Sequence, residues 1–175
     1  FAAMSTLFST IAILLTSSPF HLSDVLVGVV TLAGVFGALS TTKIGKIADQ
    51  GHTLSLTWIG LLTLIVSWFF LYFGGQSLLS YMIGYGVISL GLTIVHTSNQ
   101  NIIFRLHPDA KSQINSIYMT SYFIGGACGS ALGVYAWHHG GWKMTCIAGV
   151  SLVLCAAFFA FLDMRYHARS VPLSK

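Results

Sequence analysis

No aspartate, glutamate, lysine or arginine occurs between Gln50 and Phe104, and this uncharged run limits what the chain can fold into. Only 7% of all residues are charged, whereas 55% are hydrophobic and the mean hydropathy is +0.80. A soluble domain usually carries about a quarter charged residues. With so few charges the chain would not cover a surface in water, so the sequence predicts a protein embedded in a membrane.

The apolar segments are long enough for six transmembrane helices, since about 20 apolar residues cross the hydrocarbon core. The uncharged run holds two of them, and GGQS at 74–77 is a natural turn between the two. The expected spans are about 1–16, 25–42, 54–73, 78–103, 113–137 and 144–162. We therefore predict an all-α polytopic membrane protein, in which residues 1–175 form one six-helix bundle without a soluble domain. Because the chain starts inside an apolar segment and lacks an initiator Met, we expect it to be a fragment.

The basic residues are distributed unevenly between the two sides of these helices. One side carries Lys143 alone, and the other side carries seven: Lys43, Lys46, Arg105, Lys111, Arg165, Arg169 and Lys175. Loops rich in lysine and arginine face the cytoplasm. The distribution therefore predicts a multi-pass protein of the cell membrane with both ends of this chain in the cytoplasm.

The segment GKIADQGHT (45–53) separates the second and third expected spans and concentrates charge in a chain that has little. Its Gly45, Asp49 and Gly51 have the spacing of the signature loop between the second and third helices of a major facilitator superfamily half. The segment departs from the family, which prefers Arg or Lys, at three positions: Gln50, His52 and Thr53. In this topological place the chain resembles a transporter of the superfamily.

Two further stretches carry the same resemblance. SSPFHLS (17–23) is similar to the outer loop after the seventh helix of bacterial efflux permeases, and residues 114–142 look like their eleventh helix and the following loop. The resemblance implies helices seven to twelve of a twelve-helix fold, with a missing N-terminal six-helix half as partner. It also implies secondary active transport by alternating access in the bacterial inner membrane. Multidrug- and sugar-efflux permeases of the arabinose-efflux type are the nearest likeness, so proton-coupled efflux of a drug-like compound or sugar is expected.

Asp49 has two interpretations at the membrane edge. In the family, the loop aspartate and nearby basic residues contact a neighbouring helix and help to latch the cytoplasmic side shut. A carboxylate there can pair with a cation or accept backbone N–H bonds at a helix N-terminus. Alternatively, Asp49 merely caps the third expected helix. The glycines of the loop allow a tight turn.

The fourth expected span has one polar, aromatic face and one apolar face. On a helical wheel, the residues near His96 are aromatic or polar, and the main candidates for a substrate cavity are Tyr81, Tyr85, Ser89, His96 and Asn99. The opposite face carries Ile83, Val87 and Leu90. In lipid, a polar stripe turns towards the protein interior or a water-filled cavity, and the resemblance places this helix on the central cavity. Alternatively, the polar cluster at 96–101 is partly interfacial.

The fifth and first expected spans add further candidates. Gly125, Gly129 and Gly133 repeat every four residues, a spacing that lets helices approach closely, so we expect them to serve helix packing. Tyr118, nearer the cytoplasm, can line the cavity. Phe8 lies on a face of the first span that suits either the cavity or the core.

Other features narrow the function. No Asp or Glu lies within an expected span, so we take His96 as the titratable side chain well inside one. Proton-coupled transport usually needs such a group in the membrane. A carboxylate that couples transport to protons would therefore belong to the missing half. The histidines do not have the spacing of metal ligands. We expect no metal, no cofactor, no enzymatic activity and no nucleic-acid partner. The expected partners are the lipid bilayer, a small-molecule substrate and protons. A non-transporting membrane subunit or a degenerate remnant of a transporter is the alternative.

Overall fold

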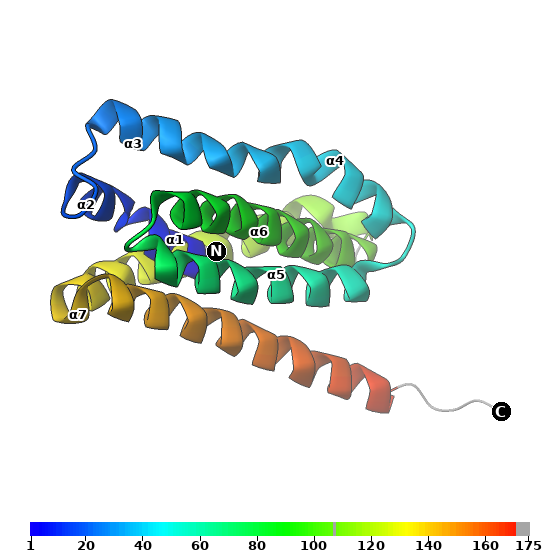
Figure 1. Cartoon of the computed structure of the whole chain (residues 1–175). Coiled ribbons are helices and arrows are strands. Elements are labelled where there is room, and N and C mark those ends of the chain that lie inside the picture. The colour runs from blue at the N-terminus through cyan, green and yellow to red at the C-terminus, as the bar shows by residue number, and fades with distance from the viewer. Residues whose placement is uncertain (107, 171–175) are drawn as a thin grey trace.

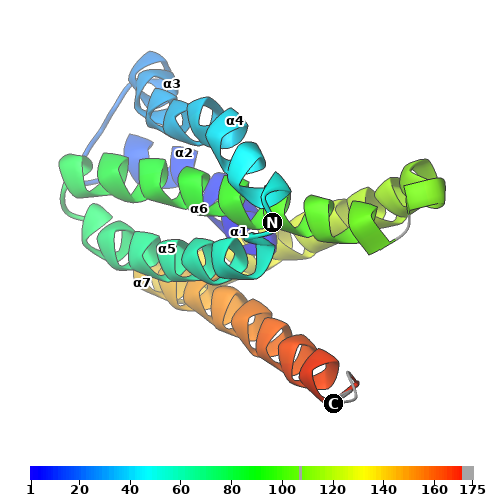
Figure 2. The same ribbon diagram turned by 90° about the vertical axis from the view of Figure 1, so that its right-hand side faces the viewer.

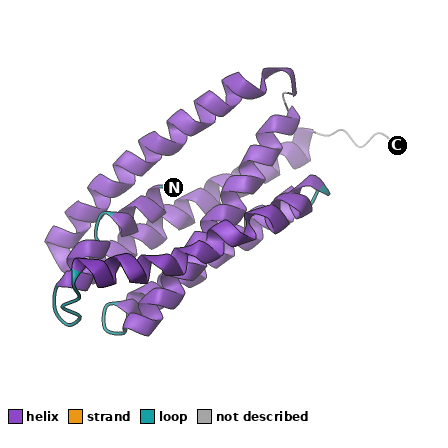
Figure 3. Ribbon diagram, turned by 90° about the horizontal axis from the view of Figure 1, so that it is seen from above, coloured by secondary structure: helices purple, strands orange, loops and turns teal. Residues whose placement is uncertain are grey.

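A computed structural model describes residues 1–106 and 108–170 of the chain, and within these ranges the regular secondary structure consists of helices, without strands. The prediction of an all-α protein is therefore confirmed. The helices are α1 (Ala2–Phe8), α2 (Ile11–Thr16), α3 (Asp24–Thr31), η1 (Leu32–Gly34), α4 (Val35–Asp49), α5 (Thr53–Gly74), α6 (Leu78–Leu106), η2 (Pro108–Ala110) and α7 (Lys111–Ser170). Figure 3 shows these helices joined by short loops.

The long helix α7 is interrupted by two adjacent glycines. Gly140 has φ −165° and ψ 18°, and Gly141 has φ 61° and ψ −150°, so neither continues the helix. A positive φ is accessible to glycine at little steric cost, which explains why the chain reverses here. The first half of α7 (111–139) and its second half (142–170) run in opposite directions, and the second half lies beside α5 (Figures 1 and 2).

Four helices of the described chain are long and apolar enough to cross a membrane: Asp24–Asp49, Thr53–Gly74, Leu78–Arg105 and the interrupted Lys111–Tyr166. The apolar segment Ala2–Thr16 is shorter. The first and second expected spans are also interrupted, at Ser9–Thr10 and by the 3₁₀ turn η1. The second continues to Asp49 instead of ending near Thr42, because no proline occurs before that residue to stop the helix.

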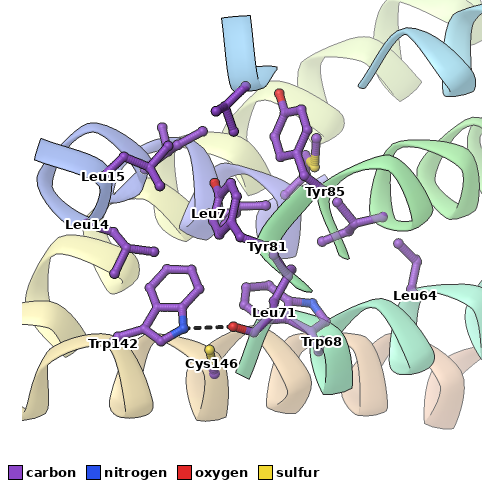
Figure 4. Packing of buried hydrophobic residues seen from close by; sticks show 14 of the residues in the cluster. Leu7, Leu14, Leu15, Leu64, Trp68, Leu71, Tyr81, Tyr85, Trp142 and Cys146 are labelled. Carbon is purple, nitrogen blue, oxygen red and sulfur yellow. Dashed lines mark hydrogen bonds between the residues drawn. The ribbon is translucent and has the colours of Figure 1, made fainter. Parts of the chain in front are cut away.

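Helices α1, α5, α6 and the second half of α7 enclose a buried cluster of large side chains (Figure 4). Trp68 and Tyr81 are almost fully buried in it, and the indole N–H of Trp142 donates to the carbonyl oxygen of Leu71 at 2.7 Å. Many apolar residues instead face outwards, among them Val25 (76% exposed) and Leu39 (72%) on α3 and α4. Outward apolar surface of this kind is stable in lipid rather than in water.

Candidate functional site

The polar face of α6 meets the first half of α7 through a hydrogen bond between side chains. The Tyr118 hydroxyl and His96 Nδ1 are 2.9 Å apart, and both residues are half-buried. Asn99 lies one turn further along α6, on the same helical face. The next residue, Gln100, has its side-chain Nε2 3.5 Å from Asn115 Oδ1. The structure thus joins His96 and Tyr118, two candidates that the sequence pattern places on separate helices.

An aromatic cluster surrounds this hydrogen bond. The rings of His96 and Tyr122 have centroids 5.0 Å apart, and those of His96 and Tyr118 are 5.5 Å apart. Phe1 stacks on Tyr122 at 4.0 Å with an interplanar angle of 11°. We name Phe1, His96, Tyr118 and Tyr122 the aromatic cluster. Helical spacing from Tyr118 points to Tyr122, but nothing in the sequence indicates that Phe1 stacks on it.

Tyr81, Tyr85 and Ser89, the other candidates on α6, are buried, with exposures of 0%, 5% and 9%. Tyr81 packs between Tyr85 and Trp142, at ring distances of 6.2 and 6.0 Å. No hydrogen-bond partner of its hydroxyl is found among the described residues. In this conformation these side chains belong to helix packing rather than to an open cavity surface.

Helix α4 and the turn η1 cover Tyr85 and Ser89. A Cβ on Gly34 would lie 2.8 Å from the Tyr85 ring, and one on Gly37 would lie 2.7 Å from the backbone of Ser89. The two glycines therefore let the backbones approach closely. Phe8 is 45% exposed, and its ring centroid lies 6.3 Å from that of Tyr85 with an interplanar angle of 62°. A helical wheel predicts the face of α6 but not the helix that covers it.

The first half of α7 also carries the glycines expected to pack. A Cβ on Gly129 would lie 2.6 Å from Ala2 Cα, and one on Gly133 would lie 2.7 Å from the Thr6 carbonyl oxygen. At Gly125 a Cβ would meet nothing within 4 Å, whereas at Gly126 it would meet the Phe1 ring. The surface that touches α1 therefore contains Gly126 in place of Gly125, because positions 126, 129 and 133 share one helical face.

The signature loop is shorter in the structure than the sequence indicates. Gly45 lies inside α4, and only Gly51, with φ 96°, turns the chain. Asp49 accepts a hydrogen bond at 2.7 Å from the Asn101 amide of α6, and no side chain caps the start of α5. The carboxylate therefore contacts a neighbouring helix instead of capping the next one.

Arg105 strengthens the same junction. Its guanidinium donates to the carbonyl oxygens of Ala48 and Asp49, at 3.2 and 2.5 Å. These carbonyls end α4, where a cation is favourable because the helix dipole is negative there. The sequence assigns Arg105 a role in orientation only, and this bridge is visible only in three dimensions. Among the described residues, no three His, Cys, Asp or Glu side chains gather as a metal site requires.

Comparison with known proteins places the chain in a family. The model of the Major Facilitator Superfamily matches residues 1–175. The chain is 45% identical over 154 residues to "Putative uncharacterized transporter YgaY" of Escherichia coli strain K12, covering 88% of this chain and 39% of that protein. It is 26% identical over 157 residues to an "Uncharacterized transporter" of Buchnera aphidicola, covering 90% and 37%.

The chain thus spans less than two fifths of the length of each of these two relatives, at 39% and 37%. No solved structure is significantly similar to it. The family match over the whole chain agrees with the apolar helices and with the polar face inside the bundle. The chain is a multi-pass membrane protein and belongs to the Major Facilitator Superfamily of transporters.

Proposed function

We propose that this chain forms helices seven to twelve of a secondary transporter that exports a drug-like compound or a sugar in exchange for protons. A preceding six-helix half supplies the other wall of the central cavity, and the two halves alternate access between the two sides of the membrane. The basic residues of the loops favour cytoplasmic placement of both ends of this chain. The membrane in this proposal is the bacterial inner membrane.

The hydrogen bond between His96 and Tyr118 is the observation that carries the proposal. Both side chains lie within membrane-crossing helices, where polar groups are costly and usually mark a substrate or ion pathway. Both are half-buried, and they lie beside the rings of Phe1 and Tyr122. Aromatic rings with polar tips suit a ligand that combines apolar area with hydroxyl or amine groups.

The same residues support the proposal of proton coupling. His96 is titratable and shares a hydrogen bond with the Tyr118 hydroxyl. Histidine changes charge near physiological pH when it is unperturbed. No carboxylate lies among the described membrane-crossing residues of α5, α6 or residues 112–162 of α7, and Asp24 and Asp49 lie at the two ends of the helix Asp24–Asp49. We therefore place any carboxylate that couples transport to protons in the preceding half.

Export from inverted membrane vesicles tests this function. The complete transporter, expressed at matched levels, should accumulate a fluorescent drug or a labelled sugar when a pH gradient is imposed, and collapse of the gradient should stop uptake. His96→Leu should remove most of this uptake. Normal membrane insertion without gradient-driven uptake of any drug or sugar offered would instead support a non-transporting subunit or remnant.

A further inference from the structure

A small cavity of about 220 Å³ lies where α5 ends and the second half of α7 begins. The aromatic rings of Tyr72, Phe73 and Trp142 line it, together with the side chains of Gln76 and Lys143. Both polar side chains are exposed. Lys143 is the only lysine or arginine between Lys111 and Arg165, so this end of the hairpin in α7 carries a single positive charge.

A second cavity, of about 370 Å³, follows the seam between the same two helices. It shares Tyr72 with the first and extends along Trp68 and Ile65 on α5 and along Ile147 and Val150 on α7. From Tyr72 to Ile65 a helix rises about 10 Å, at about 1.5 Å per residue. The apolar groove therefore stays within one leaflet, since half the hydrocarbon core is about 15 Å thick.

The walls of this groove are held in place by packing. Trp142 donates to the Leu71 carbonyl oxygen, and Gly75 gives its indole room to lie against the end of α5. Further along, the Trp68 ring lies against Gly149 of α7 (Figure 4 shows Trp142, Cys146 and Trp68 along the seam). Trp68 is only 1% exposed, so its ring is held in place within the wall of the groove.

We propose that the two cavities form one binding site for an anionic glycerophospholipid such as phosphatidylglycerol. The Lys143 ammonium and the Gln76 amide hold the phosphate, the aromatic rings flank the glycerol, and one acyl chain lies in the groove between α5 and the second half of α7. The pairing of a single cation with a continuous apolar groove matches an amphipathic anion. A headgroup ammonium would be repelled by Lys143, so phosphatidylcholine is the weaker ligand. With both ends of the chain in the cytoplasm, as proposed above, this lipid lies in the outer leaflet. The binding site itself does not depend on that orientation.

Photocrosslinking tests this site independently of transport. The purified protein is reconstituted in nanodiscs that contain phosphatidylglycerol with a diazirine on one acyl chain, and crosslinked peptides are mapped by mass spectrometry. We expect labels on residues 65–72 and 146–151. Lys143→Gln should lower labelling there about fivefold, which corresponds to about 1 kcal/mol for one lysine at an anionic membrane surface. Lys143→Arg should preserve it.

Two matched variants keep the result interpretable. Lys111→Gln removes an exposed cation at the other end of the first half of α7 and should leave labelling unchanged. Ile147→Trp, at a position 56% exposed, should fill the groove and displace the lipid without disturbing the core. Equal labelling by diazirine phosphatidylcholine or unchanged labelling in Lys143→Gln would overturn the proposal.

Discussion

The first half of α7 contacts α1 and α6 in different ways. Against α1 it presents glycines, and its backbone lies so close to Ala2 and Thr6 that a single Cβ would clash. Against α6 it presents side chains, with Tyr118 bound to His96 and Asn115 near Gln100. One interface is specified by the absence of side chains and the other by hydrogen bonds between them.

The first half of α7 therefore uses one face for close packing and another face for hydrogen bonds of the kind that recognise a ligand. In lipid, apolar side chains gain little by leaving the solvent, so close van der Waals packing of small residues holds helices together. Such a contact has few alternative arrangements, and we expect α1 and the first half of α7 to move as a unit. Hydrogen bonds between half-buried side chains can exchange for bonds to a ligand, so we expect the contact with α6 to change during transport.

The largest expected effect is on the glycine contact. Gly129→Leu should sharply reduce the yield of folded protein, because the side chain would enter the backbone of α1 and overpacking costs about 1–3 kcal/mol or more. Folded yield is measured by fluorescence-detected size-exclusion chromatography in detergent. Gly125→Leu, one turn earlier on the same helix, is the matched control and should be tolerated because its Cβ meets nothing within 4 Å. Equal loss in both variants would mean that α7 tolerates no large residue on either face.

A second expected effect is on transport at the contact with α6. His96→Leu should retain folded yield but lose most gradient-driven uptake, since leucine offers no hydrogen bond to Tyr118 or to a substrate. His96→Gln should keep part of the activity because an amide still donates and accepts. Initial rates in sealed vesicles, across a range of pH, measure both variants. Wild-type rates and pH dependence in His96→Leu would identify His96 as a histidine that serves packing only.

Much of the architecture can be predicted from the sequence, because hydropathy and turn residues act locally. The uncharged run and GGQS indicate where α5 ends and α6 begins, and the structure has α5 to Gly74 and α6 from Leu78. Interruptions are harder to predict. The 3₁₀ turn at Leu32–Gly34 carries no proline, and the packing of Gly34 against Tyr85 of α6 is a contact that the local sequence does not indicate.

The candidate site is less predictable, because covering a side chain requires a second helix. Periodicity places Tyr81, Tyr85 and His96 on one face of α6, yet the structure buries the two tyrosines and leaves His96 half-buried. The glycine face illustrates the same limit. A repeat of four suggests Gly125, whereas the surface against α1 follows Gly126, one residue away and about 100° around the helix.

A smaller effect is expected from the hydroxyl of Tyr118. Tyr118→Phe keeps the ring beside Tyr122 but removes the hydrogen bond to His96, which for a bond between membrane helices is worth about 0.6 kcal/mol on average. Folded yield should be unchanged, and uptake should fall by less than in His96→Leu. Uptake measured in the double variant with His96→Leu should equal that of His96→Leu alone. Additive losses would show that the two side chains act separately.

The smallest effect is expected at the hydrogen bond within the glycine contact. Thr6 Oγ1 donates to the Gly129 carbonyl oxygen at 2.9 Å, in a buried position, and also lies 3.0 Å from the Ala2 carbonyl oxygen of its own helix. Thr6→Val keeps the branched shape and removes the hydroxyl. Carbonyl oxygens inside a helix are already paired with backbone N–H groups, so the loss should be about 0.6 kcal/mol or less.

The midpoint of thermal unfolding in detergent should therefore move only slightly in Thr6→Val, and uptake should match that of the wild type. Ser9, the residue that follows α1, provides the control, because its hydroxyl donates back to the Thr6 carbonyl oxygen of α1 at 3.1 Å, and Ser9→Ala should have a similarly small effect. If Thr6→Val instead destabilised the protein as much as Gly129→Leu, a hydrogen bond would specify the contact with α1. The distinction between a packed interface and a hydrogen-bonded one would then fail, since both neighbours of α7 would be held by the same kind of interaction.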